Sequence, residues 1–164
     1  MDMGNMKRIL FIVAAILLVS CGNKDLEVFS VYYVPVGTNY GYAQRPDAII
    51  EHGLHTTISS YEIGEIFKIH KSKADYVHSD SRIVIVNERN GEMAIIDHSM
   101  HVNFPTPSTA NCSDCRTINY NGSYCYNPDI SYEIDDEYLS QIISEIEHQL
   151  KKENPAHRYF KENK

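Results

Sequence analysis

The chain has 164 residues and a formal net charge of −7, from 15 Lys and Arg against 22 Asp and Glu. An acidic chain without a basic run argues against a nucleic-acid partner, because binding to nucleic acid depends on cationic contacts with phosphates. The length suits one domain with a hydrophobic core of its own.

A short apolar segment lies near the N-terminus. Lys7 and Arg8 precede residues 9–20, which read Ile-Leu-Phe-Ile-Val-Ala-Ala-Ile-Leu-Leu-Val-Ser, and Cys21 follows. This order is typical of a secretory signal peptide. A transmembrane helix needs about 20 apolar residues, and this segment is shorter, which favours a cleaved signal over an anchoring helix.

Residues 18–21, Leu-Val-Ser-Cys, resemble the lipobox of bacterial lipoproteins. The resemblance implies cleavage before Cys21, with a diacylglycerol on its thiol and an acyl chain such as palmitate on its new amine. Several acyl chains anchor a protein stably where one is marginal. In these lipoproteins Gly rather than Asp after the cysteine favours the outer membrane, and Gly22 stands there. We therefore expect a protein anchored through Cys21 to the bacterial envelope, on the outer membrane and facing the periplasm.

Four segments follow from this interpretation. We expect a signal peptide at residues 1–20, a lipidated tether at 21–27, a single domain at 28–155 and a flexible tail at 156–164. The first segment of the domain, Val-Phe-Ser-Val-Tyr-Tyr-Val, is rich in β-branched and aromatic residues and predicts a strand over 28–34.

The following segments predict short elements. Residues 47–52 suit one helical turn that Asp47 caps and Gly53 stops, and residues 55–58 suit a short strand. Ser59 with Glu62 matches a capping box. It opens an apolar stripe that predicts a helix over 60–73. The stripe consists of Ile63, Ile66, Phe67 and His70.

Asn90 and Gly91 separate two apolar runs, residues 82–88 and 92–97. Asn-Gly between strands is a strong signal for a two-residue hairpin loop. Such a loop sets Arg89 opposite Glu92 and Val86 opposite Ile95. Because neighbouring positions in both runs are apolar, we expect both faces of this hairpin to be covered, at the centre of the sheet.

The region 103–129 is irregular and holds three cysteines. Residues 117–120 and 123–126 predict a second hairpin around Asn121-Gly122, which sets Cys125 opposite Ile118. The oxidising periplasm predicts a disulfide. In this register Cys125 faces away from Cys115, which favours a Cys112–Cys125 bridge. Cys112-x-x-Cys115 also resembles half of a zinc ribbon or a redox motif, but it lacks a second ligand pair and sits in a loop.

The last element is an amphipathic helix. Acidic residues precede it and Lys151 and Lys152 end it, as the helix dipole favours, before Asn154-Pro155 stops it. Its apolar stripe consists of Leu139, Ile142, Ile143, Ile146 and Leu150. Together the elements predict an α+β fold, a small antiparallel sheet with two helices packed on one face.

Histidines are the candidates for chemistry. His98 and His101 follow Asp97, but in an extended segment they point to opposite faces. The sequence has no helical metalloprotease pattern, serine hydrolase elbow or phosphate-binding glycine loop. We therefore expect no catalytic residue, no metal site and no cofactor.

The 12 tyrosines are more informative. Tyrosine is enriched at binding interfaces, although its suitability for half-buried strands gives a structural alternative. We expect a non-catalytic binding protein with a protein partner, such as an inhibitor or immunity-like protein, an exclusion factor or an envelope assembly factor. The alternative is a periplasmic enzyme that is metal-dependent or acts on the cell wall. The expected partner-binding residues are Tyr40, Tyr42, Tyr120, Tyr124 and Tyr126.

Overall fold

The computed structural model describes residues 26–35, 45–68, 72–74, 80–107 and 116–162, with the backbone alone for 72–74 and 162. Within these ranges no helix has the length and apolar character needed to cross a membrane.

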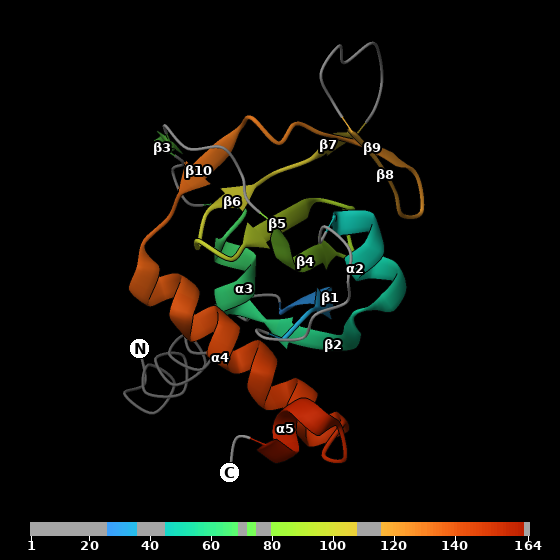
Figure 1. Ribbon diagram of the computed structural model, residues 1–164. Helices are drawn as coiled ribbons and strands as arrows, with labels where there is room; N and C mark the ends of the chain where they lie inside the picture. Colours follow the sequence, from blue (N-terminus) through green and yellow to red (C-terminus); the bar gives the residue numbers. More distant parts are fainter. Residues whose placement is uncertain (1–25, 36–44, 69–71, 75–79, 108–115, 163–164) are drawn as a thin grey trace, which may run out of the picture.

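A seven-stranded antiparallel sheet forms the centre of the molecule (Figure 1). Its strand order is β2-β1-β4-β5-β6-β10-β3, and a separate small sheet has the order β7-β9-β8. The strands of the large sheet are β1 (Glu27–Tyr33), β2 (Leu54–Ser60), β3 (Ser72–Ala74), β4 (Ser81–Asn87), β5 (Met93–Asp97), β6 (Val102–Asn103) and β10 (Ser131–Glu133). Those of the small sheet are β7 (Thr106–Pro107), β8 (Arg116–Asn119) and β9 (Ser123–Tyr126). The predicted α+β class is confirmed.

Both faces of the central strands are buried, as the apolar runs predict. Ile83 and Ile85 of β4 pack on one face with α3 (Tyr61–Glu65) and α4 (Asp136–Glu153). Val84 and Val86 pack on the other face, against α2 (Pro46–His52) and the small sheet. The prediction of two helices on one face is confirmed, and α2 lies on the opposite face.

The central hairpin differs from its predicted register. Val86 pairs with Met93 and Val84 with Ile95, a shift of two residues that leaves every side chain on its expected face. The cause is a longer loop. Asn87 donates its N–H to Glu92 O at 2.8 Å and accepts the N–H of Arg89 on its side chain at 2.9 Å. Residues 88–91 therefore form the turn, and Asn87 rather than Arg89 stands opposite Glu92.

The helix predicted over 60–73 is much shorter. Ser60, not Ser59, is the N-cap and accepts the N–H of Ile63 at 3.2 Å. Helix α3 ends at Glu65, and residues 72–74 form β3 in the large sheet instead. Gly64 lets α3 lie close to β1, because a Cβ there would stand 2.9 Å from Glu27 Oε2. His70 lies outside the described residues.

Helix α4 follows its prediction. Asp135 caps it by accepting the N–H of Tyr138 at 2.9 Å, and all five residues of the predicted apolar stripe are buried. The expected flexible tail at 156–164 is wrong where the structure describes it. Residues Arg158–Glu162 form helix α5. Phe160 of this helix is buried in the same core cluster as the apolar residues of α4.

Candidate binding groove

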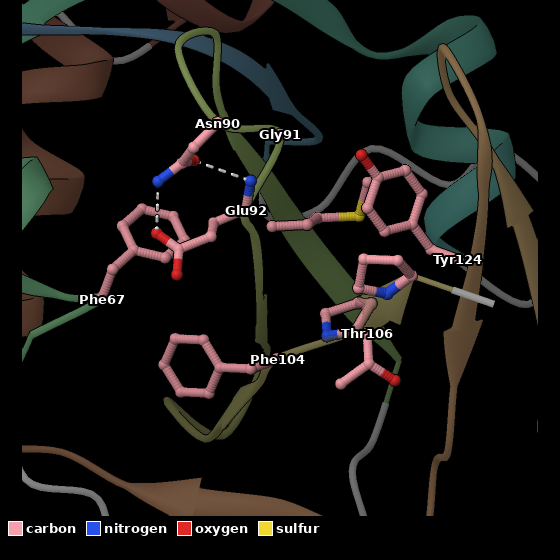
Figure 2. A pocket seen from close by; sticks show the side chains of 10 residues that line it. Phe67, Asn90, Gly91, Glu92, Phe104, Thr106 and Tyr124 are labelled. Carbon is pink, nitrogen blue, oxygen red and sulfur yellow. Dashed lines mark hydrogen bonds between the residues drawn. The ribbon is translucent and has the colours of Figure 1, made fainter. Parts of the chain in front are cut away.

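An apolar groove of about 230 Å³ lies between the tip of the central hairpin and the small sheet (Figure 2). Four separate segments of the chain supply its walls. Its lining residues are Phe67, Asn90, Gly91, Glu92, Met93, Phe104, Pro105, Thr106, Pro107 and Tyr124.

One wall is the end of a row of aromatic rings that begins in the core. The ring of buried Phe29 stacks on Phe67 with centroids 6.0 Å apart, and Phe67 meets the edge of Phe104 at 6.2 Å. Phe104 in turn contacts Tyr132 of β10 at 5.6 Å. A continuous row of ring contacts therefore joins this wall to the core.

The hairpin tip forms the second wall. Asn90 holds Glu92 twice, by accepting its backbone N–H at 2.9 Å and by donating its side-chain amide to Oε2 at 2.8 Å. Gly91 has φ +74° and approaches Tyr124 so closely that a Cβ there would lie 2.8 Å from the tyrosine hydroxyl. The left-handed φ favours glycine here, and any larger residue would also displace the end of the Tyr124 side chain.

Tyr124 lies on the opposite side of the groove from Phe67 and Phe104 (Figure 2). Its place depends on the second hairpin, whose register also differs from the prediction. Ile118 pairs with Tyr124 rather than Cys125, because Asn121 takes φ 45° in a loop one residue longer than predicted. A one-residue change reverses the faces of a strand, so Tyr124 lies on the same face as the buried Ile118.

The tyrosines predicted to bind a partner differ in their location and burial. Tyr124 and Tyr120 are half-buried, and Tyr120 donates its hydroxyl to Glu88 at 3.0 Å. Tyr126 is 3% exposed and packs in the core against α2 and β4, so its prediction as a contact residue is wrong. Burial raises its pKa to about 12. Tyr40 and Tyr42 lie outside the described residues.

Cys125 is disulfide-bonded. The other cysteines, Cys21, Cys112 and Cys115, lie outside the described residues. Cys125 stands opposite Thr117, not Ile118, so the register argument that favoured Cys112 over Cys115 no longer holds. The Cys112–Cys125 pairing stays a prediction.

The histidine segment is a tight turn between β5 and β6 rather than extended chain. The buried carboxylate of Asp97 accepts the N–H groups of Ser99 at 2.8 Å and His101 at 2.9 Å, and Met100 takes φ 64°. The carboxylate of Asp97 thus stabilises the turn. Among the described residues no three His, Cys, Asp or Glu side chains are grouped to hold a metal ion.

Sequence reasoning missed a polar cluster between the sheet and α4. Arg82 donates to the hydroxyl of Tyr33 at 2.9 Å and to Glu147 Oε1 at 3.2 Å, and Tyr33 also donates to Glu147. Burial, reinforced by the hydrogen bond to Glu147, raises the pKa of Tyr33 far above its ordinary value. These contacts tie α4 to the sheet, while Nε of Arg82 is buried without a hydrogen-bond partner among the described residues. Tyr33 and Arg82 lie within apolar strand segments whose neighbours give no local signal for this cluster.

Comparisons with protein families, with curated proteins and with solved structures found no match.

Proposed function

We propose that this chain is a lipid-anchored binding protein of the bacterial envelope, which holds a protein partner at the groove beside Tyr124. The observation that carries the proposal is the groove, in which three aromatic rings and two prolines from separate segments line one recess. Rigid aromatic side chains in pockets are the usual anchors of protein interfaces.

The size of the groove favours a protein partner over a small molecule. Sites for small molecules typically enclose about 300–1,000 Å³. The groove, at about 230 Å³, suits one inserted side chain. Half-buried Tyr120 lies on the same hairpin as Tyr124, although it does not line the groove, and its ring contacts Tyr32 at 5.8 Å.

The anchor gives this surface its location. The lipobox resemblance supports lipid on Cys21, and β1 begins at Glu27. Six residues of extended chain span about 20 Å, so the domain would stay close to the bilayer. Gly22 supports the outer membrane, facing the periplasm.

Changing Cys21 to Ser should release the protein from the membrane or stall its processing. Fractionation of cells and mass spectrometry of the mature N-terminus measure both. In the same assay Gly22→Asp should keep the lipid but move the protein to the inner membrane. An unmodified Cys21 in the mature, membrane-bound protein would refute lipidation.

Affinity capture tests the binding role. The mature lipoprotein, purified with its envelope in mild detergent, should retain a partner that Tyr124→Ala loses. Tyr138→Ala is the matched control, because Tyr138 is also half-buried but lies on α4, away from the groove. Equal capture by all three proteins, each with a normal melting midpoint, would place the binding surface elsewhere.

The enzyme alternative has less support. A convergent group of polar side chains would favour it, and Tyr33, Arg82 and Glu147 do converge. Their hydrogen bonds are made to one another, however, and Asp97 serves the turn that carries His98 and His101. Each arrangement is explained by the stability of the fold.

A further inference from the structure

A single carboxylate stands in the otherwise uncharged groove. Among the ten described residues that line it, only Glu92 is charged. Figure 2 shows its exposed carboxylate held by the amide of Asn90. A fixed negative charge next to apolar walls favours a ligand with a cationic end and an apolar stem.

The aromatic walls favour the same ligand. Phe67 and Phe104 line one side of the groove and Tyr124 the other. Cations are attracted to the faces of aromatic rings within about 6 Å, and more strongly where water is excluded. The acidic charge of the whole chain, −7, adds a long-range attraction for a basic partner.

We propose that the groove accepts a lysine side chain of the partner protein. Its methylene stem packs along Met93 and the aromatic rings, and its ammonium group binds Glu92. This inference rests on the proposed function, because it names the chemistry of the partner at the same groove.

Lysine is favoured over arginine by the bonding of Glu92. Arginine binds carboxylates best in a bidentate manner, through both oxygens. In the groove Oε2 of Glu92 already accepts the amide of Asn90 at 2.8 Å, so a guanidinium bound through both oxygens would have to share Oε2 with that amide at its second acceptor position. An ammonium group is a compact charge that needs only the other oxygen.

Three tripeptides test the proposal on the mature lipoprotein in detergent micelles. They are acetyl-Gly-Lys-Gly-amide, the norleucine peptide, which keeps the stem without the charge, and the arginine peptide. Amide NMR spectra should show saturable shifts at Glu92, Met93 and Tyr124 with the lysine peptide. The norleucine peptide should bind about fivefold more weakly or worse, and the arginine peptide more weakly than lysine.

Two matched variants separate the local charge from the net charge. Glu92→Gln should weaken the lysine peptide by about fivefold or more. Glu88→Gln removes the same charge from the same hairpin, but its carboxylate faces Tyr120 and does not line the groove, so the affinity should change little.

Equal binding of the lysine and norleucine peptides, or equal effects of the two Glu variants, would overturn the lysine assignment. So would the absence of groove shifts with every peptide. If Tyr124→Ala still abolishes capture of the partner in those cases, the binding role of the groove stands and only the ligand chemistry fails. If capture is also unaffected, both proposals fail.

Discussion

Single residues decide the shape of the groove, and few of them stand out in the sequence. Asn90-Gly91 signals a turn, but the contact of Gly91 with Tyr124 links residues 33 positions apart and has no local signature. Tyr124 and Tyr126 look equivalent in sequence. They lie two residues apart on β9, yet Tyr124 lines the groove and Tyr126 is buried in the core between the small sheet and the central hairpin.

Tyr33 gives the chain a measurable dependence on alkaline pH. Its folded pKa lies well above the ordinary value of 10.0, because it is buried and donates to Glu147. Below pH 10 both the folded and unfolded states hold the proton, so the contribution to stability is complete. Above pH 10 only the unfolded state loses it, so the free energy of unfolding should fall as the pH rises.

Urea denaturation at several pH values from 8 to about 11 measures this dependence. Tyr33→Phe should make the alkaline decline shallower, and the part that remains includes Tyr120, Tyr126 and Tyr138, whose pKa values burial also raises. A slope that is identical in wild type and Tyr33→Phe would contradict the account of this cluster.

At the scale of elements, the spacing of apolar residues correctly predicted which faces of a helix or strand are buried. The five-residue stripe of α4 and the two runs of the central hairpin were predicted with their buried faces. Register was not, because side-chain hydrogen bonds of Asn87 and the backbone of Asn121 set the loop lengths. The end of α3 at Glu65 was not predicted either, because the apolar stripe continues past it to Ile66 and Phe67.

Val86→Asp tests the position of the central hairpin. Val86 is 1% exposed and lies between β1 and β5, so an aspartate there has no partner for its charge. We expect the free energy of unfolding to fall by several kcal/mol, of the order of 3 or more. Arg89→Asp, at the exposed loop, should cost about 0.5 kcal/mol or less. A melting midpoint unchanged by Val86→Asp would show that β4 is not central.

The disulfide of Cys125 should stabilise the small sheet and with it the wall that carries Tyr124. Removing a native disulfide typically costs about 2–5 kcal/mol, and Cys125→Ser should show a loss in this range. Thiol counting on the denatured, unreduced protein checks the bridge, and peptide mapping identifies its partner. Three free thiols in the mature lipidated protein would contradict it. A bridge to Cys115 would correct the predicted pair alone.

At the scale of the whole molecule, the proposed membrane anchor and the groove differ in how far apart in the sequence their residues lie. The proposed anchor rests on a local motif, residues 7–22, and stays a prediction. The groove joins the end of α3, the hairpin tip, the β6–β7 connection and β9, and it exists only once both sheets are assembled. Composition therefore predicted tyrosine at a binding surface but not which tyrosine lines the groove, nor that Phe67, Phe104 and Glu92 line it.

The dissociation constant of the captured partner, measured for three variants, tests the central claim most directly. The claim is that this protein acts by contact at the groove. Tyr124→Ala should weaken binding by about 2 kcal/mol or more, roughly thirtyfold, as expected for a hot spot. Single His98→Ala and His101→Ala variants should bind like wild type. Normal binding by Tyr124→Ala, together with loss of activity in the histidine variants, would contradict the claim and favour an enzyme.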